Sequence, residues 1–420
     1  MATQSMRLLV ADANAPWTRS LFAAMPPRVR ADSLRLESLG RLRSGLPGAL
    51  LRCARPRRLG PNQWEHLRII PGWTRAYGLS CSIVARWLRR RVLHRMHGGD
   101  GTPESRSLPR VSDSGTGPTV YEAETAHRNV PATGGPGRTW VIYTVPQYAG
   151  VAERLRSFRG VRQAYYAYDP YTEYEGWAAD KVRAWEQTLF AVCDKIIAIS
   201  EALRQDFQSL SGRKAHYLPN AVSADFLQRM RLPTDRPADL PAPDHGRIVG
   251  CIGQINASSY DWNLIDELAH LRPTEQFFFI GPSIEADPVK RAAIDRVLTR
   301  PNIRWLGPRP HAALPRYLQH FDLCLNPLAM NPANDRRSPL RLYDYLATDK
   351  PILSTAIAEA HRHLPHLSIC RSAAEMAAAI ERVRSGKYEM DWEARRRYIQ
   401  ANTWEHRAAQ LLAILERDDA

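Results

Sequence analysis

The chain has 420 residues, of which 44% are hydrophobic and 24% are charged, so the composition excludes an intrinsically disordered protein. No run of 18 apolar residues is present, which excludes a standard transmembrane helix, and the length predicts two or three domains. The net charge of +15 is unevenly distributed, because residues 1–100 hold 18 Arg, no Lys and five acidic residues. A local basic field of this kind attracts nucleic acid, anionic lipid or phosphorylated substrates.

The cysteines indicate the cellular compartment. Six of them are scattered along the chain without a CxxC pair, which disfavours a disulfide framework and a cysteine zinc site. The first residues also lack the basic, apolar and small-residue pattern of a secretory signal. Together these features predict a protein of the reducing cytoplasm.

The first part of the chain combines a strand with an arginine-rich region. Met6–Asp12 is a short apolar run that predicts the first strand of an open sheet. Residues 41–96 are rich in arginine, and Ile83–Met96 has the spacing of an amphipathic helix. Residues 97–138 are rich in Gly, Ser, Pro and Thr, which predicts a flexible loop. The arginine-rich region has three interpretations: a solvated face, a nucleic-acid arm, or a segment lying on anionic lipid.

Strands and helices alternate from residue 139 to the end of the chain. In the first half we expect strands at Thr139–Val145, Val161–Asp169, Lys195–Ser200 and 215–222, and helices near Ala152–Arg159, Asp180–Val192 and 201–207. In the second half we expect strands at Arg247–Ile252, Gln276–Ile280, Asn302–Trp305, Asp322–Asn326, Pro351–Ser354 and Leu367–Cys370. The helices expected there are Trp262–His270, Pro288–Leu298, Ala313–His320, Pro339–Leu346, Ala373–Ser385 and Asp391–Arg417. This alternation predicts parallel sheets with helices on their faces.

A proline-rich stretch divides the two alternating series. Residues 232–246 contain four prolines and no apolar pattern, as in an inter-domain linker. We therefore expect an α/β protein of two doubly wound, Rossmann-like domains that face each other across a cleft. In open parallel sheets ligands bind beyond the carboxyl ends of the strands, so both domains can present those ends to one shared site.

The most informative stretch is Asn334–Ser354. Ser338 fits a helix N-cap and Pro339 the first helical position, and such a helix start offers free N–H groups to a diphosphate. Arg341 and Asp344 follow at three-residue spacing, so both lie along one side of the helix. A guanidinium grips phosphate oxygens, and a carboxylate one turn further accepts hydrogen bonds from ribose hydroxyls. The alternative is a surface helix with an ordinary Arg–Asp pair, and composition alone favours that alternative.

The same stretch, NDRRSPLRLYDYLATDKPILS, resembles the donor-site signature SPLK-x-YEYLA-x-GKP of GT-B glycosyltransferases. It is most similar to teichuronic-acid-type and xanthan-type glucuronosyl transferases. The resemblance runs from Thr139 to the C-terminal end, through YYAYDPYTEY, IIAIS, YLPNAVSADF, RIVGCIGQIN, FFFIGP, NIRWLGPRPHAALPRYLQHFDLCLNPL and NTWEHRAAQLL. It implies the GT-B fold, with residues 1–231 binding the acceptor and residues 247–395 binding a nucleotide sugar. Residues 396–420 would form a helix that returns to the first domain.

The resemblance also implies roles for individual residues of the donor site. Ser338, the backbone of Leu340 and the side chain of Arg341 would contact the donor diphosphate. Asp344 would replace the usual Glu and hold the ribose or the sugar. The donor would be a UDP- or GDP-sugar acting as co-substrate, with no other cofactor.

Further positions in the second half bear on the donor site. Gly253 and Gln254 follow the first strand of that half, where glycine lets the backbone approach phosphates closely. An equally weighted alternative is that Gly253 simply ends a strand. Two residues depart from the family pattern, because Arg336 stands where Glu is common and Asp349 where Gly is usual.

Asp169 is the candidate general base of the first half. It ends a strand among several tyrosines, and by the resemblance it would take the proton from an acceptor hydroxyl. The alternative is a structural Asp in an Asp-Pro turn with Pro170 and Tyr171. Glu186 also matches a family position, but its place in the middle of a helix favours a structural ion pair.

The motifs favour a metal-independent glycosyltransferase. The sequence has no D-x-D triad and no His cluster at metal-ligand spacing, so no metal ligands are assigned. The acceptor would be a saccharide or a polyprenyl-diphosphate-linked saccharide in cell-envelope or exopolysaccharide assembly. We expect a protein at the inner face of the plasma membrane, attached to anionic lipid through residues 41–96 rather than bound to nucleic acid. The alternatives are a nucleotide-sugar epimerase of the same fold and a non-catalytic binding or scaffold protein.

Overall fold

The computed structural model describes residues 6–11, 16–26, 29–36, 57–60, 63–66, 81–82, 84–89, 139–158, 161–242 and 246–417. The loop predicted for residues 97–138 lies outside the described residues, as does most of the arginine-rich region. Of the helix predicted at Ile83–Met96, residues 84–89 are described and are helical.

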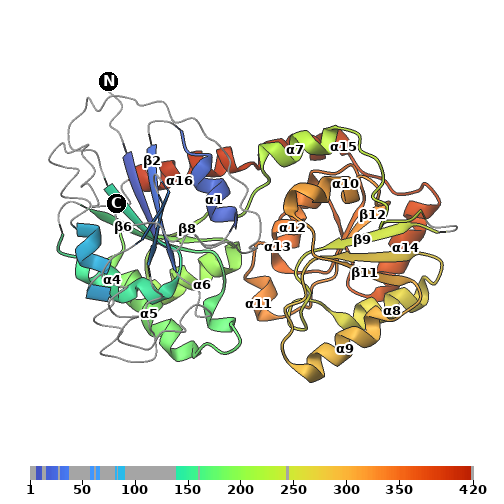
Figure 1. Cartoon of the computed structure of the whole chain (residues 1–420), viewed down its shortest axis with the longest axis horizontal. Helices are drawn as coiled ribbons and strands as arrows, with labels where there is room; N and C mark the ends of the chain where they lie inside the picture. Colours follow the sequence, from blue (N-terminus) through green and yellow to red (C-terminus); the bar gives the residue numbers. More distant parts are fainter. Residues whose placement is uncertain are drawn as a thin grey trace, which may run out of the picture.

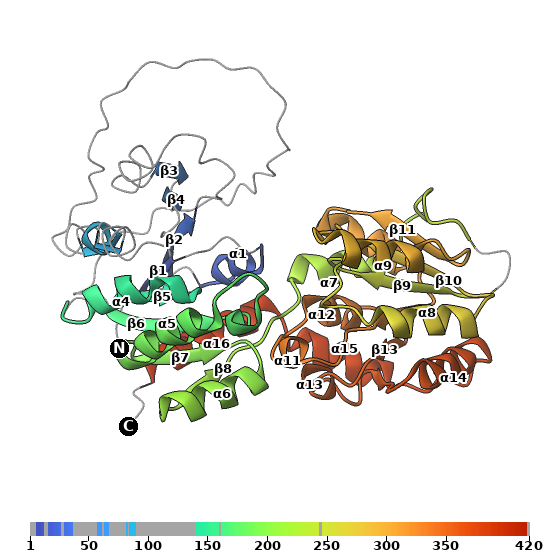
Figure 2. The ribbon, with the colours of Figure 1, turned by 90° about the horizontal axis from the view of Figure 1, so that it is seen from below.

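Two sheets with helices packed on their faces form two lobes (Figures 1 and 2). In the first lobe the strand order is β3-β4-β2-β1-β5-β6-β7-β8. Its described strands pair in parallel except for β3 with β4. The strands are β1 (Met6–Ala11), β2 (Val29–Leu36), β3 (Arg57–Gly60), β4 (Gln63–His66), β5 (Thr139–Tyr143), β6 (Arg162–Ala167), β7 (Lys195–Ala198) and β8 (Ala215–Tyr217).

The central strands of the first lobe are covered on both faces. All five residues of β5 and all four of β7 are buried, which explains why they are continuous apolar runs rather than alternating ones. Helix α1 lies on one side of the sheet, and α4, α5 and α6 lie on the other (Figure 1). These helices are α1 (Pro16–Ala23), α4 (Ala149–Leu155), α5 (Ala179–Val192) and α6 (Glu201–Ser211).

The second lobe is built on a fully parallel sheet of order β11-β10-β9-β12-β13-β14. Its strands are β9 (Ile248–Ile252), β10 (Gln276–Ile280), β11 (Ile303–Gly307), β12 (Leu323–Asn326), β13 (Ile352–Ser354) and β14 (Ser368–Ile369). Alternate residues of β9 enter two separate cores. Val249 and Cys251 pack with α8 and α14, whereas Ile248 and Ile252 pack with α10 and α12. The helices are α8 (Trp262–Leu271), α9 (Pro288–Leu298), α10 (Leu314–Leu318), α11 (Pro332–Asp335), α12 (Leu340–Leu346), α13 (Ala358–His361) and α14 (Ala373–Arg384).

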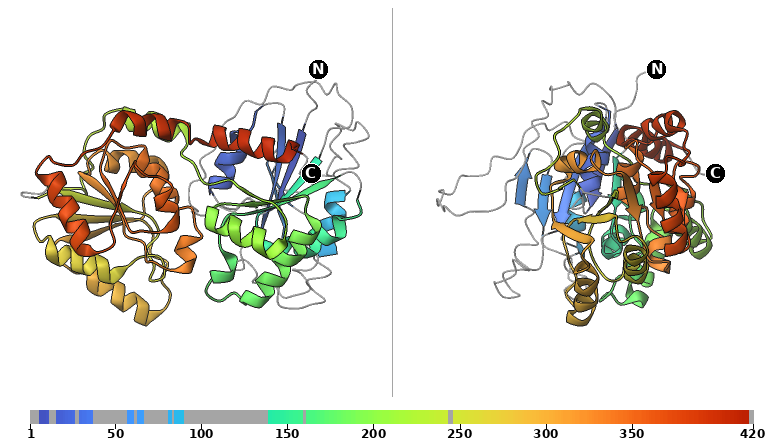
Figure 3. Two further views of the ribbon diagram at one scale, coloured as in Figure 1. Left: turned by 180° about the vertical axis from the view of Figure 1, so that it is seen from behind. Right: turned by 90° about the vertical axis from the view of Figure 1, so that its right-hand side faces the viewer.

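Within the described residues, the chain passes between the lobes twice. On the first passage, α7 (Ala224–Arg231) contributes Phe226 to the core of the second lobe, and residues 232–242 then contain neither helix nor strand. On the second, α15 (Trp392–Gln400) packs on the second lobe and α16 (Trp404–Glu416) on the first (Figure 3). Val222 pairs with the extended Thr403 between these two helices, so the passages lie side by side. The tail predicted as one helical stretch is thus two helices.

No helix in the described part of the chain is both long enough and apolar enough to cross a bilayer.

Candidate donor site and the inter-lobe interface

Two glycines lie at the carboxyl ends of two neighbouring strands of the second sheet. Gly253 follows β9 with φ of 131°, and Gly281 follows β10 with φ of 152°. A Cβ on Gly281 would lie 1.9 Å from the carbonyl oxygen of Gly253, so only glycine allows these two turns to touch. Gln254 comes next and is exposed. The backbone here is therefore bare of side chains at the strand ends, where ligands of parallel sheets bind.

Arg341 lies directly against this glycine turn. A Cβ on Gly253 would be 2.5 Å from one Nη of Arg341, and the other Nη donates to the Tyr260 hydroxyl at 2.6 Å. The guanidinium also sits 4.7 Å from the centre of the Tyr260 ring. Among the described residues Arg341 has no carboxylate partner, so its charge is balanced by aromatic and hydroxyl contacts alone. The guanidinium is thus placed at the strand ends with its charge available to an anion.

Helix α12, which carries Arg341, starts one residue later than predicted. Its N-cap is Pro339, no side chain caps it, and Leu340, its first residue, is 39% exposed. The prediction that Ser338 is the N-cap is wrong, because the Ser338 side chain turns elsewhere. Its hydroxyl lies 3.4 Å from the Asn220 backbone nitrogen and 3.4 Å from the Tyr343 hydroxyl. Ser338 therefore contacts the first lobe.

Asp344 is buried one turn after Arg341. Both of its carboxylate oxygens lie near Nε2 of His311, at 3.1 and 3.3 Å, and the His311 ring stacks on Phe226. Burial raises the pKa of Asp344, an effect that His311 partly offsets. The hydrogen bond with Asp344 in turn raises the pKa of His311. The predicted diol acceptor is therefore held by an imidazole in this structure.

Asp169, the candidate base, reaches across to the second lobe. Its Oδ1 accepts from Nε of Arg337 at 2.9 Å, and its Oδ2 accepts from the Tyr174 hydroxyl at 2.5 Å. Arg337 also lies over the Tyr174 ring. The Asp-Pro turn forms as well, because the Tyr171 backbone nitrogen donates to the Asp169 carbonyl oxygen. The carboxylate of Asp169 takes no part in that hydrogen bond.

One loop connects Asp169 to the glycine turn. Arg337, which holds Asp169, is within 3.4 Å of the Ser259 hydroxyl, and the next residue, Tyr260, holds Arg341. Arg337, the partner of the predicted base, and Arg341, the predicted phosphate-binding residue, thus contact two consecutive residues, Ser259 and Tyr260. Arg337 was missed from the sequence, since its partner is 168 residues away in the other lobe.

The two positions that depart from the family pattern are both in ion pairs. Arg336 pairs with Asp206 of the first lobe, and its carbonyl accepts from the Ser200 hydroxyl at 2.7 Å. Asp349 pairs with Arg396 at 2.6 Å on the surface. Arg336 therefore joins the lobes, while Asp349 links the residues after α12 to α15.

Glu186 differs from its sequence interpretation. It is 4% exposed and accepts a hydrogen bond from the Tyr165 hydroxyl at 3.0 Å, and it has no ion pair within the described stretches. Burial raises its pKa to about 7. The predicted ion pair is wrong. In the same described part of the chain, no group of three His, Cys, Asp or Glu residues is arranged to hold a metal ion.

Known proteins resemble this chain in its second lobe and in its fold. Residues 261–413 match the family model described as glycosyl transferase-like. A teichuronic acid biosynthesis glycosyltransferase by name, TuaH of Bacillus subtilis (strain 168), is 27% identical over 177 residues. That match covers 41% of this chain and 43% of TuaH, so it spans less than half of either protein.

Solved structures extend the likeness to the whole chain. The Anabaena Alr3699/HepE complex with UDP has a TM-score of 0.65 at 13% identity, covering 98% of this chain and 99% of its own. The E. coli trehalose-6-phosphate structure with bound UDP-2-fluoro glucose has a TM-score of 0.66, the same identity and the same coverage of both chains. At such identities the likeness shows the fold, and it confirms the fold class predicted from the sequence. Residues 261–413 are therefore similar to a glycosyl transferase-like family, and the chain as a whole has the two-lobed fold of the GT-B glycosyltransferases.

Proposed function

We propose that this protein transfers a glycosyl group from a nucleoside diphosphate sugar to an acceptor hydroxyl. The observation that carries the proposal is the guanidinium of Arg341, which lies against the bare turn at Gly253 without a carboxylate partner in the described chain. A planar guanidinium beside exposed backbone suits the oxygens of a diphosphate. UDP, which the structurally similar HepE complex contains by name, is the first donor nucleotide to test.

The remaining donor contacts follow from the residues around this turn. Gln254 and Leu340 are exposed beside Gly253 and Arg341, so they can border the sugar and the phosphates. Asp344 is paired with His311, and it would act on the donor through this imidazole. Ser338 would act less directly, since its hydroxyl and carbonyl are engaged by Asn220 and Tyr343.

Asp169 is proposed as the base. As the acceptor oxygen bonds to the anomeric carbon, the carboxylate takes the hydroxyl proton, and the bond from that carbon to the diphosphate breaks. The electron pair of the broken bond stays on the diphosphate oxygen, where the charge of Arg341 stabilises it. Arg337 keeps the Asp169 carboxylate oriented from the donor lobe.

The acceptor is proposed to be a saccharide, either free or linked to a polyprenyl diphosphate. The partial match to TuaH, which is named for teichuronic acid biosynthesis, supports a role in envelope polysaccharide assembly. The concentration of arginine in residues 1–100 supports attachment to the anionic inner face of a membrane.

The proposal is tested by replacing Arg341. We expect Arg341→Ala to weaken UDP binding by at least about tenfold, because a charge-assisted hydrogen bond contributes about 1.5–3 kcal/mol. Isothermal calorimetry measures this affinity, and the exposed Arg396→Ala is the matched control. Equal UDP affinity in wild type and Arg341→Ala would remove the assignment.

Product analysis then separates transfer from its alternatives. With a UDP-sugar panel and a membrane extract as acceptor source, the proposal requires sugar to appear in the acceptor. An epimer formed without acceptor would indicate an epimerase, and UDP-sugar binding without turnover would indicate a non-catalytic protein.

A further inference from the structure

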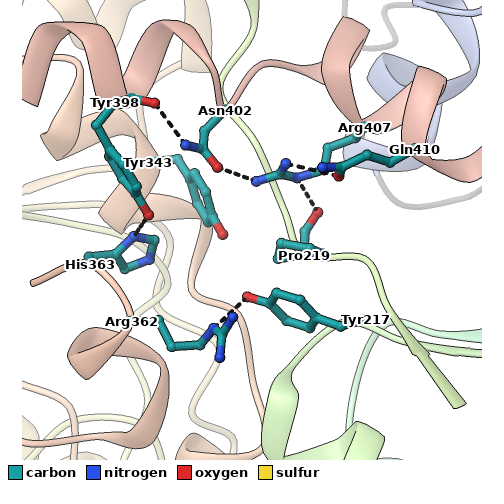
Figure 4. Close-up of a pocket in the computed structure, with 9 residues that line it drawn as sticks. All are labelled: Tyr217, Pro219, Tyr343, Arg362, His363, Tyr398, Asn402, Arg407 and Gln410. Carbon is teal, nitrogen blue, oxygen red and sulfur yellow. Dashed lines mark hydrogen bonds between the residues drawn. The ribbon is translucent and has the colours of Figure 1, made fainter.

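A cavity of about 230 Å³ lies between the lobes (Figure 4). Both lobes build its walls. Tyr217 and Pro219 come from the first lobe, Tyr343, Arg362 and His363 from the second, and the others from α15, α16 and the segment between them: Tyr398, Asn402, Arg407 and Gln410. We call it the seam cavity. It is separate from the glycine turn, since Tyr343 and Arg341 lie on opposite sides of α12.

The seam cavity is cationic. Its lining includes two arginines and no carboxylate. Arg407 is 4% exposed, and its guanidinium is fixed by the carbonyl oxygens of Pro219 and Asn220 and by the side-chain oxygens of Asn402 and Gln410. All of these partners are neutral, so the buried charge of Arg407 has no ion pair within the described residues. A buried cation without a counter-charge favours an anion nearby.

Arg362 supplies a second charge at the edge of the seam cavity. Its Nε donates to the Tyr217 hydroxyl at 3.2 Å, and the guanidinium lies 4.4 Å from the centre of the Tyr217 ring. The Tyr217 hydroxyl itself donates to Glu359 at 2.6 Å, but Glu359 does not line the cavity. Burial raises the pKa of Glu359 to about 7, and Glu201 is a second acidic group that acts on Arg362 and raises its pKa. The terminal nitrogens of Arg362 remain available for an oxyanion.

His363 is an unsatisfied polar group in the same wall. It is 2% exposed, its Nδ1 lies 2.9 Å from the Tyr398 hydroxyl, and its Nε2 is buried without a hydrogen-bond partner in the described structure. Burial and the neighbouring arginines lower the pKa of His363 to about 3, so the ring is neutral. When Tyr398 donates to Nδ1, Nε2 carries the proton and can donate it. A buried donor without a partner costs stability.

We propose that the seam cavity binds a phosphate-type oxyanion, either inorganic or as the phosphate group of a small metabolite. Arg362, Arg407, His363 and Tyr343 lie around the cavity on different sides (Figure 4), which suits a tetrahedral anion better than a planar carboxylate. The cavity volume accommodates a phosphate or pyrophosphate. Because both lobes form its walls, an anion bound there stabilises the arrangement in which the lobes touch.

The test is a calorimetric titration of the full chain with sodium phosphate and sodium pyrophosphate at constant ionic strength. The protein is first saturated with UDP, so that the donor site is occupied. We expect saturable binding of one anion per chain. Arg362→Gln should weaken it at least tenfold, whereas Arg397→Gln, an exposed arginine of α15 paired with Glu393, should leave it unchanged. Both variants should bind UDP as wild type does, which shows that they are folded.

A second readout locates the anion. In ¹⁵N spectra of the histidine side chains, phosphate should shift the Nε2 signal of His363, and it should do so much less in Arg362→Gln. The proposal is overturned when wild type saturated with UDP shows no saturable phosphate binding, when the two arginine variants weaken binding equally, or when sodium acetate binds as tightly as phosphate. These outcomes are independent of whether sugar transfer is observed.

Discussion

Individual side chains decide where charge is held in this molecule. Asp169 has a guanidinium on one oxygen and a phenol on the other, so its carboxylate is oriented from both lobes. Glu186, by contrast, is buried beside a single tyrosine hydroxyl. Burial disfavours the charged form of Glu186 and raises its pKa. Two acids of the same lobe therefore have different surroundings.

Asp169→Asn tests the proposed base. The amide keeps the size of the side chain but cannot accept the acceptor proton, so we expect transfer to fall at least about a hundredfold. UDP affinity should not change, because Asp169 lies outside the contacts of Arg341. Transfer is measured with labelled UDP-sugar and UDP binding by calorimetry. Asp206→Asn is the control, since it removes an inter-lobe ion pair of the same kind, and it should reduce transfer less than tenfold. Full activity in Asp169→Asn would place the base elsewhere.

Glu186→Gln tests the buried acid. Because its pKa is raised from 4.5 to about 7, the folded chain binds this proton more tightly than the unfolded chain. The free energy of unfolding therefore falls as pH rises from about 4.5 to about 7, and above that range the buried charge costs about 3 kcal/mol. Glu186→Gln, which keeps an acceptor for Tyr165, should be more stable than wild type at pH 8 and nearly equal at pH 4.5. Urea unfolding at both pH values measures this, with the exposed Glu153→Gln as control. A constant difference between the two proteins would refute the assignment.

At the scale of elements, α12 separates two sites. One side carries Arg341 to the glycine turn, and the other carries Tyr343 to the seam cavity. The turn after β9 leaves room for the Arg341 guanidinium because Gly253, the residue of that turn, has no side chain. The position of the guanidinium therefore depends on a glycine in another element.

Gly253→Ala tests this dependence. The new Cβ would lie 2.5 Å from Arg341, and the guanidinium is the part that can move, so we expect it to be displaced. UDP affinity should fall about tenfold. Gly176→Ala is the matched control, because Gly176 also has a positive φ, of 79°, but open space around its Cβ position. Both variants should lose about 1–3 kcal/mol of stability from backbone strain, measured by urea unfolding. Loss of UDP binding in both, or in neither, would contradict the interpretation.

The sequence predicted elements well where a local pattern decides them. The strand at Gln276–Ile280 and the helix at Pro288–Leu298 are confirmed residue for residue, since one is a continuous apolar run and the other begins with an Asp N-cap and Pro. The four-residue helices α11 and α13 were missed because they are too short to show periodicity. The start of α12 was misplaced because a contact with Asn220, in the other lobe, occupies Ser338.

The residues of the candidate site, like the helices and strands, were predictable only where a local sequence pattern places them. Arg341 and Gly253 could be assigned to a helix and a strand end, and the structure brings them into contact. Arg337 and the seam cavity were not predictable, because they arise from contacts between residues far apart in sequence. Neither spacing nor composition encodes such contacts.

At the scale of the whole molecule, charge pairs join the two lobes. Arg337 pairs with Asp169 and Arg336 with Asp206, while Lys290 pairs with Glu175 at 2.8 Å on the surface. The passages of the chain also meet, where Val222 pairs with Thr403. Uncharged hydrogen bonds cross as well, from the Asn220 amide to the Ser338 carbonyl and from the Ser200 hydroxyl to the Arg336 carbonyl. The charge pairs are the part of this contact that salt can screen.

The adjacent arginines 336 and 337 test this arrangement. Partly exposed pairs contribute about 0.5–1 kcal/mol each, so the double variant Arg336→Gln/Arg337→Gln should shift the balance between joined and separated lobes about tenfold. Small-angle X-ray scattering should then show a larger radius of gyration. The exposed neighbours Arg396 and Arg397 give the matched control, since Arg396→Gln/Arg397→Gln removes the same charge and two pairs within the second lobe. Wild type should expand as sodium chloride is raised, and the 336/337 variant should respond less because its pairs are already absent. An unchanged radius in that variant at low salt would mean that the backbone passages alone hold the lobes together.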